Sequence, residues 1–370
     1  MQSIEKISSF QFFILVFLFV IGSSVLHIPT VLVAAAKEDG WLVSIIGGLL
    51  GIGISLFYGL LAQRLRGKNM LQMYEEVFGA AIGKVFTLLF AYFCLILSSM
   101  ILRGIGDFMV TQIMHETPIE IIMACFVFII IMAKKYGIEV FARTAEIFFP
   151  WIIFLFFFAI VLILPKLNFQ WIYPILDNGI KPLIKGTIYY LGFPYFECVL
   201  LLMVVPYLKS FQKTKKILVL GTTGGAFVLF VTVIVAIMVL GADLTESQSY
   251  VTYILAKKLS IPRVLERMEV IIAVFWIFTI FYKLLLCFFC LTKSIGALFT
   301  IENENILAYP LGMLLIGTTI IAGENVVTLN DFSSTIWPFF SFQMGIVLPL
   351  LVLLVDVMKN LNKPAKSTSE

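Results

Sequence analysis

Long apolar runs separated by short polar breaks recur along the whole chain. Most of them reach about 18 residues, the length at which an α-helix crosses ~30 Å of hydrocarbon at ~1.5 Å per residue. No stretch between them is long enough for a soluble domain. The pattern predicts about ten membrane spans, at residues 10–36, 41–62, 85–111, 119–133, 143–164, 185–208, 217–240, 266–292, 305–322 and 333–358.

The composition is also that of a membrane protein. Hydrophobic residues make up 61% of the chain and charged residues 13%, whereas soluble domains carry roughly 25% charged residues. All five cysteines lie in apolar runs, where small buried hydrophobes are expected rather than a disulfide or a metal site. The net charge of +4 forms no basic stripe, so we expect membrane lipid and no nucleic acid as a partner.

Motifs of enzyme chemistry are missing from the sequence. It contains no P-loop, no dinucleotide fingerprint, no His-Glu-x-x-His and no nucleophile elbow. We therefore expect no enzyme activity, no cofactor and no metal.

Lys and Arg are unevenly shared between the two sets of loops. With the N-terminus placed in the cytoplasm, the internal segments carry 16 of these residues and the external segments carry 8. Positive charge is enriched in cytoplasmic loops, so we expect both termini on that side. We treat residues 1–359 as a single transmembrane domain and the polar residues 360–370 as a flexible cytoplasmic tail.

Two spans, five apart, contain residues that interrupt a helix at mid-membrane. The first carries Gly-Ser-Ser at 22–24 ahead of Pro29, and the sixth carries Gly-Phe-Pro-Tyr at 192–195. In hydrocarbon, an unpaired backbone group costs several kcal/mol unless it lines a cavity or meets a ligand. Matching interruptions are typical of inverted-repeat transporters, so we predict an all-α, five-plus-five inverted repeat, 10–164 and 185–358, with broken helices 1 and 6. The alternative is two incidental kinks filled by neighbouring side chains.

The breaks also indicate a class of ligand. The N-terminal end of a half-helix favours an anion, and a C-terminal end favours a cation. A zwitterion such as an amino acid fits both ends. Val25, Leu26 and Phe193 around the breaks favour a small apolar side chain on that ligand.

Two ionisable side chains lie deep within spans six and eight. Glu197 follows the second break by about one turn, and Lys283 lies at a similar depth. Charges inside a membrane are costly and mark functional sites, so we expect these two to pair. They either line the cavity, with the ammonium where a sodium ion sits in ion-coupled transporters, or only hold the helices together. His27, near the first break, is either packed there or linked to protons.

Other candidate residues lie in spans three and eight. Arg103 and Asp107 share a helix face at i, i+4 and form either a buried structural pair or a gate on the outer vestibule. Ser99 faces the cavity or bonds back to a carbonyl of its own helix. Phe278 and Tyr282 also share a face, and they either face the breaks or pack in the core.

Several short elements spread along the chain carry a family resemblance. They are residues 4–8 (Ile-Glu-Lys-Ile-Ser), residues 22–24 with Pro29, residues 137–143 (Gly-Ile-Glu-Val-Phe-Ala-Arg) followed by Glu146 and Pro150, residues 192–195, and Arg267-x-Glu269 with Trp276. Together these elements resemble the B-type subunits of bacterial spore germinant receptors. These subunits, also called spore germination permeases, belong to the amino acid, polyamine and organocation transporter superfamily.

The resemblance implies a ten-helix fold of inverted repeats in the inner membrane of the spore. It also implies partnership with an A-type membrane subunit and a C-type lipoprotein. A nutrient germinant, commonly an amino acid, would bind among spans one, three, six and eight. Mapped onto this sequence, that pocket would contain Gly22, Ser23, Ser24, Val25, Ile96, Ser99, Gly192, Phe193, Phe278 and Tyr282.

Two functions compete at this point. A receptor subunit would bind the germinant and shift between two arrangements that its partner subunits detect, whereas a permease would carry an amino acid together with protons or sodium. Lys283 near the expected cation position argues against sodium coupling, which favours the receptor or a proton-linked carrier. A structural or enzyme-bearing membrane protein would be preferred if the breaks proved helical and packed.

Overall fold

The computed structural model describes residues 5–65, 67–258, 268–322 and 332–361. Most of these residues are helical, and among them no strand occurs beyond an isolated bridge between Ile7 and Leu208. The last helix continues to Leu361, so the first two residues of the tail expected at 360–370 are helical. Residues 362–370 lie outside the described residues. Arg267 of the family resemblance also lies outside them.

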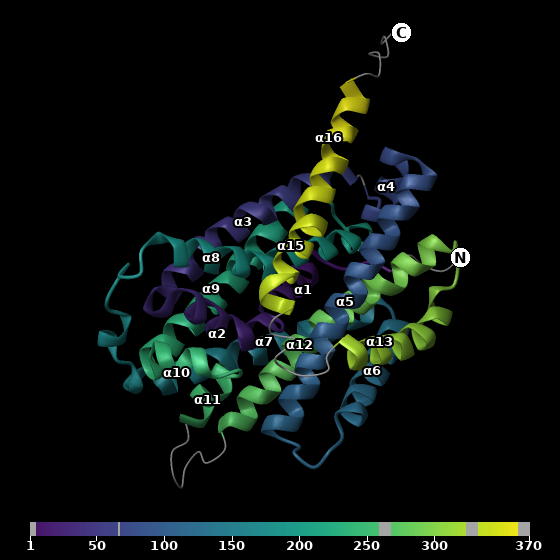
Figure 1. The fold of residues 1–370 in the computed structure, drawn as a ribbon. Helices are drawn as coiled ribbons and strands as arrows, with labels where there is room; N and C mark the ends of the chain where they lie inside the picture. The colour runs from purple at the N-terminus through teal and green to yellow at the C-terminus, as the bar shows by residue number, and fades with distance from the viewer. Residues whose placement is uncertain (1–4, 66, 259–267, 323–331, 362–370) are drawn as a thin grey trace, which may run out of the picture.

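The bundle is built from long helices joined by short turns (Figure 1). The helices are α1 (Ser9–Ile21), α2 (Ser24–Ala36), α3 (Gly40–Leu65), α4 (Met70–Phe78), α5 (Ala80–Gln112), α6 (Ile119–Lys135), α7 (Ile138–Ile163), α8 (Ile180–Tyr190), α9 (Thr214–Leu240), α10 (Ala242–Ser247), α11 (Val251–Lys258), α12 (Met268–Leu298), α13 (Ala308–Ala322), α15 (Trp337–Phe342) and α16 (Leu348–Leu361). Short 3-10 and π segments are η1 (Lys37–Asp39), η2 (Leu164–Lys166), η3 (Phe169–Ile172), η4 (Leu191–Tyr195), η5 (Phe196–Met203), η6 (Val205–Tyr207), η7 (Glu304–Leu307) and η8 (Gln343–Val347).

Eight helical segments of the described chain are long and apolar enough to cross a membrane, and one of them joins α2 to α3. α1 has 13 residues and α6 has 17, so neither reaches that length alone. The first expected span is divided between α1 and α2, which is why no single long helix represents it. Each of the ten expected spans overlaps helix, and the all-α membrane fold is confirmed.

α1 lies inside the bundle (Figure 1). Its side chains at residues 14–21 are all buried, so this part of the helix has no face turned outward. A helix that is apolar on every side needs neighbours all round. One of them is α9, whose Gly221 lets the backbone approach Val16 of α1: a Cβ at position 221 would lie 2.7 Å from the Cβ of Val16.

Two glycines of α3 let this helix pack closely against tyrosines of the second half of the fold. A Cβ at Gly47 would overlap the ring of Tyr190, and one at Gly51 would overlap the ring of Tyr195. The two tyrosines are themselves joined, because the Tyr195 hydroxyl donates to the Tyr190 hydroxyl at 3.0 Å. Gly53 meets nothing within 4 Å and lies on the exposed side of α3. The glycines at 47 and 51 therefore let α3 approach α8 and η4 closely.

The two ends of the bundle are tied by different contacts. Near the N-terminus, the Ile7 amide donates to the Tyr207 carbonyl at 2.8 Å and the Lys209 amide donates to the Ile7 carbonyl at 3.1 Å. These bonds join the start of the first span to the end of the sixth. At the other end, α10 and α11 cover α2, and Thr30 Oγ1 donates to the Gln248 carbonyl at 2.7 Å. Figure 1 shows this end at the lower left and the N-terminus at the right.

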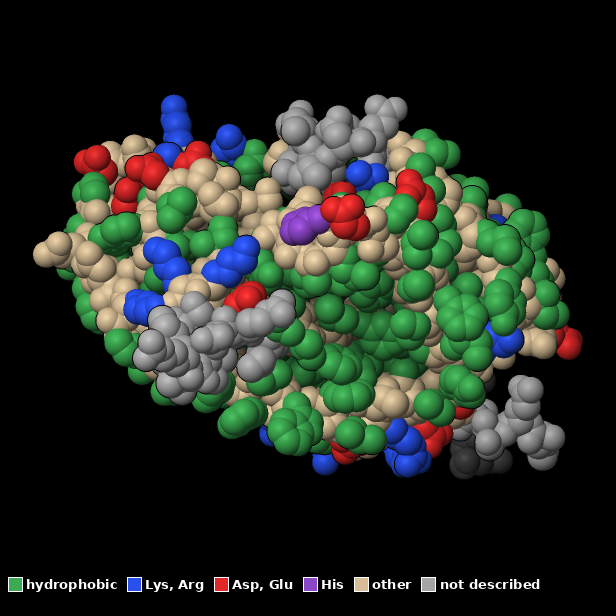
Figure 2. Space-filling model, turned by 90° about the horizontal axis from the view of Figure 1, so that it is seen from below, with side chains coloured by type: hydrophobic (Ala, Val, Ile, Leu, Met, Phe, Trp, Pro, Cys, Tyr) green, Lys and Arg blue, Asp and Glu red, His purple; other side chains and the backbone are tan. Residues whose placement is uncertain are grey.

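The outer surface is largely apolar. Figure 2 shows a broad area of hydrophobic side chains on one face, with charged side chains gathered mainly along its margins. Many large apolar residues are exposed on α3, α7 and α13, among them Leu49 at 65%, Trp151 at 66% and Met313 at 73%. Such a surface is stable in contact with hydrocarbon rather than water.

Candidate functional site

The first break lies between α1 and α2. Gly22 follows α1 with φ 6° and ψ −118°, and α2 begins at Ser24. The Gly22 amide still donates to the Leu18 carbonyl at 2.8 Å, and the Gly22 carbonyl accepts a 3.4 Å hydrogen bond from Thr279 Oγ1 of α12. The Leu26 amide donates to the Ser23 carbonyl at 3.3 Å, and the Ser23 side chain supplies no cap to the first turn of α2. The expected interruption is therefore present.

The second break lies between α8 and η5. Phe193 has φ −147° and ψ 98°, which are values of extended backbone, and Pro194 follows it. The chain then resumes a helical course as the 3-10 segment η5. Gly192 packs against α15, because a Cβ there would lie 2.9 Å from the Cα of Pro338. Both interruptions expected from the sequence are confirmed.

A buried ion pair links spans six and eight beside the breaks. Lys283 Nζ lies 2.7 Å from Glu197 Oε2, and neither side chain has any exposed area. Glu197 Oε1 also accepts a hydrogen bond of 2.9 Å from Trp337 Nε1. The ammonium lies 4.3 Å from the ring centroid of Phe193 and 5.4 Å from that of Phe19, within the range of cation–π attraction. The pairing that the sequence predicts is present.

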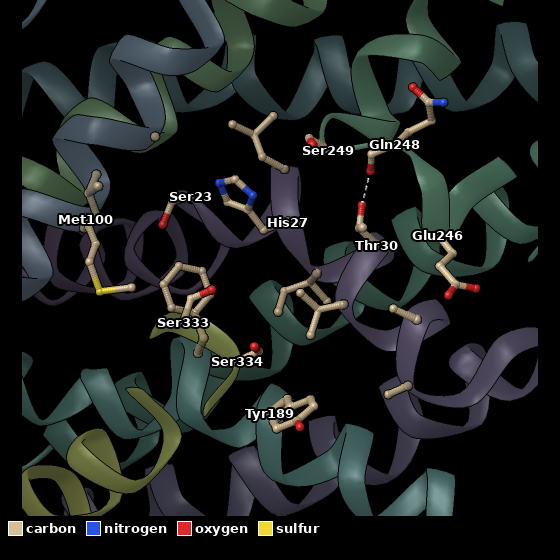
Figure 3. Close-up of a pocket in the computed structure, with 18 of the residues that line it drawn as sticks. Ser23, His27, Thr30, Met100, Tyr189, Glu246, Gln248, Ser249, Ser333 and Ser334 are labelled. Carbon is tan, nitrogen blue, oxygen red and sulfur yellow. Dashed lines mark hydrogen bonds between the residues drawn. The ribbon is translucent and has the colours of Figure 1, made fainter. Parts of the chain in front are cut away.

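The main cavity begins at the first break and extends along α2 towards α10. Its volume is about 530 Å³, within the range of small-molecule sites. Its walls come from α2, α5, α8, η4, α10 and α12, and from Ser333 and Ser334. In Figure 3, Ser23, His27 and Thr30 follow one another along α2 beside the open space. The cavity therefore lies on the side of the breaks away from the N-terminus.

Two of the predicted site residues line this cavity, Ser23 and Phe193. Ser23 Oγ and Ser24 Oγ are buried, and neither has a hydrogen-bond partner in the described chain. An unpaired buried hydroxyl costs free energy unless a guest molecule or water satisfies it. The break thus leaves two buried hydroxyls without hydrogen-bond partners among the described residues.

Other predicted residues of the pocket lie away from the main cavity. Val25 lines a second, smaller cavity on another side of α2. Ser99 Oγ bonds to the Leu95 carbonyl at 2.9 Å and lies 2.9 Å from Thr318 Oγ1 of α13, so it links α5 to α13. The ring centroids of Phe278 and of Phe148 in α7 are 4.4 Å apart.

The remaining predicted residues are packed or paired. Tyr282 is 2% exposed, and the half-buried Ile96 packs against the core. Arg103 Nε donates to both carboxylate oxygens of Asp107 at 3.0 Å, so the expected pair is present. Arg103 directly precedes Gly104, which lines the cavity.

One face of α2 lines the cavity, and this face was not identified from the sequence as part of the site. Ser23, His27, Thr30 and Ala34 all line the cavity, and their spacing of four, three and four residues places them on one side of the helix. Small and polar residues at this spacing in an otherwise apolar span were the available signal. The wall from α5, which includes Met100, carries no such signal because its lining residues are mostly apolar.

Contacts of the N-terminal segment fix the other side of the breaks. Glu5 Oε2 accepts a hydrogen bond of 2.7 Å from the amide of Ile138, at the start of α7. Gln11 Nε2 donates to Glu146 Oε2 at 2.8 Å. With the bonds of Ile7 to η6 and Lys209, these contacts tie α1 to spans five and six. The cavity lies on the other side of the breaks, where its lining includes Glu246 and Ser247 of α10.

The sequence model of the family described as "Spore germination protein" matches residues 6–327. One relative is spore germination protein KB of Bacillus subtilis (strain 168), which is 27% identical over 361 residues, covering 96% of this chain and 95% of the relative. Putative spore germination protein YfkT of the same strain is 25% identical, covering 96% of this chain and 98% of the relative.

Solved structures of transporters share the fold. MhsT in complex with L-phenylalanine superimposes with a TM-score of 0.66 at 13% identity, covering 96% of this chain and 99% of that one. Mhp1, a nucleobase-cation-symport-1 family transporter with bromovinylhydantoin bound, gives 0.64 at 13% identity, covering 96% and 88%. The five-plus-five inverted repeat is thereby confirmed. Relatives and neighbours are germination proteins and transporters, so the prediction that the chain is not an enzyme also stands.

Proposed function

Because the chain belongs to the spore germination protein family, we propose that it is the B-type membrane subunit of a germinant receptor. A small, amino acid-like germinant binds in the main cavity, at the break between α1 and α2. The observation that carries this proposal is the buried, unpartnered hydroxyl of Ser23, which lines the cavity just before α2, with the unpartnered hydroxyl of Ser24 next to it in the chain.

The chemistry of the break suits a zwitterion. A carboxylate is favoured beside the first amides of α2, because they carry the positive end of that helix dipole. An ammonium group is favoured at the last carbonyls of α1, where the dipole is negative. The adjoining walls, which include Met100, Phe193 and Ile280, suit a small apolar side chain.

The buried ion pair supports a receptor over an ion-coupled carrier. Lys283 places its amino group beside the broken segments, 2.7 Å from Glu197 Oε2. A protein with this tethered cation needs no free sodium at the same place to balance the carboxylate. The alternative, a proton- or sodium-coupled amino acid permease, draws its support from the transporter fold of the structural neighbours.

Signalling follows from a shift of populations. A germinant that binds one arrangement of the bundle more tightly than another shifts the chain towards it, and the A-type membrane subunit and C-type lipoprotein detect the change. The excess of Lys and Arg in one set of loops supports cytoplasmic termini, with the cavity open to the outer side of the spore inner membrane.

Binding and uptake distinguish the two functions. The purified chain in proteoliposomes is offered radiolabelled amino acids, with spores that lack the subunit tested against the same panel. A receptor binds one or a few of them saturably without concentrating them, and the mutant spores lose their response to the same compounds. Concentrative uptake driven by a proton or sodium gradient would establish the permease instead. Absence of saturable binding to any compound that triggers wild-type spores would contradict both.

A further inference from the structure

A second cavity, of about 70 Å³, lies on the other side of α2. Val25 lines this second cavity, whereas Ser23 lines the main one. Its walls come from α2, α7, α9, α11 and α12, and it shares no lining residue with the main cavity. Its lining includes Val25, Ala159, Thr232, Thr252, Ala256 and Ile272. This space has no part in the function proposed above.

The hydroxyls that line this second cavity are already engaged. Thr232 Oγ1 donates to the Val228 carbonyl at 2.8 Å, and Thr252 Oγ1 donates to the Val25 carbonyl at 3.4 Å. A buried water needs two to four polar partners, and an apolar cavity without them stays dry. The space therefore suits hydrocarbon.

The volume of the second cavity and its position indicate which hydrocarbon group would fit it. Its volume is about half of the ~150 Å³ apolar cavity that admits benzene, so a narrow chain end fits better than a ring. Its α7 wall includes Phe156, Ala159 and Ile160, which are only partly buried. α7 is the least buried of the eight long apolar segments, and its Val161 is 62% exposed. The cavity therefore lies beside the surface that meets the acyl chains of the bilayer.

We propose that the second cavity receives the end of an acyl chain from a membrane lipid. The chain end enters from the α7 side and fills the space behind Val25, so that lipid packs against the first turn of α2. Because Val25 lies two residues beyond Ser23, the bilayer then contacts the same half-helix that the germinant contacts from the other side.

Photolabelling tests this proposal. The purified chain is reconstituted with a phosphatidylcholine that carries a diazirine at the end of one acyl chain, irradiated, and mapped by peptide mass spectrometry. We expect label to concentrate on the cavity segments of α7 and α12, around Ala159 and Ile272. The substitution Ala159→Phe fills the space and should reduce this label several-fold. The matched substitution Val161→Phe, on the exposed side of the same helix, should leave it unchanged.

A second filling substitution guards against misfolding. Ala256→Leu fills the cavity from α11, and it should reproduce the loss of label in protein that elutes as the wild type does in size-exclusion chromatography. Label spread evenly over the exposed faces of α3 and α7 would overturn the proposal, as would label that persists in both filled variants. Labelling of the cavity by a free diazirine-bearing alkane but not by the lipid would overturn the lipid as the source.

Discussion

Lys283 lies across the first break directly against Gly22. A Cβ at Gly22 would lie 2.5 Å from Cδ of Lys283 and 2.9 Å from its Cβ. The glycine thus makes room for the lysine stem, and the stem carries the ammonium to Glu197 in span six. The two broken spans are connected through one residue of α12, so a change at either break displaces the same ion pair.

Enlarging Gly22 should therefore abolish the germination response. In Gly22→Val the added methyls displace Lys283 and separate it from Glu197, while the apolar character that directs membrane insertion is kept. Spores carrying the variant should contain the protein at the membrane but fail to respond. Gly53→Val is the matched control, because nothing lies within 4 Å of a Cβ there. A normal dose–response in Gly22→Val would remove Gly22 from the site.

Replacing one partner of the buried ion pair should destabilise the chain more than replacing both partners together. Glu197→Gln or Lys283→Met alone leaves an uncompensated buried charge, at a cost of about 3–5 kcal/mol. The double variant leaves no such charge and should recover most of that stability. Thermal unfolding in detergent, combined as a double-mutant cycle, measures the coupling. Additive losses in the double variant would show that the two charges do not stabilise each other.

Removing the Ser23 hydroxyl should weaken germinant binding specifically. A hydrogen bond to a charged group contributes about 1.5–3 kcal/mol, which corresponds to roughly tenfold to a hundredfold in Kd. Ser23→Ala should show this loss. Ser99→Ala is the control, because Ser99 bonds within α5 and to α13 rather than lining the cavity. Equal affinities of the two variants, measured with labelled germinant, would place the carboxylate elsewhere.

Loss of Glu5 should loosen the N-terminal segment. Its carboxylate accepts the Ile138 amide and lies so close to Gly137 that a Cβ there would overlap it. Glu5→Ala should speed amide hydrogen exchange at Ile7, which bonds to the end of span six. Glu116→Ala, at an exposed position after α5, should not. Unchanged exchange at Ile7 would show that its backbone bonds hold the segment without Glu5.

Local chemistry explains which features were predictable from the sequence. The break in span six was visible because Pro194 cannot donate a backbone hydrogen bond in any context. The pairing of Glu197 with Lys283 was predictable because an isolated charge is not tolerated in hydrocarbon. Both inferences depend on residue type and depth alone, and neither needs to know how a helix is rotated.

The direction in which each helix faces was not predictable. Ser99 lies at a depth that fits the site, but the packing of α5 against α13 turns it towards Thr318. Phe278 similarly faces Phe148 of α7. In α2 the small and polar residues share the face that lines the cavity. In α5 the polar residues Ser99, Arg103 and Asp107 also share a face, but their hydrogen bonds go to other groups of the protein, so a polar face alone does not show which helix lines the site.

Obstruction of the main cavity tests most directly whether the germinant binds there. Met100→Trp adds bulk to the wall from α5, whereas Met313→Trp adds the same bulk to an outward-facing side chain of α13 that is 73% exposed. Equilibrium binding of labelled germinant to both purified variants is the measurement. We predict that Met100→Trp loses binding while Met313→Trp binds as the wild type does. Wild-type affinity in a folded Met100→Trp variant would contradict the account.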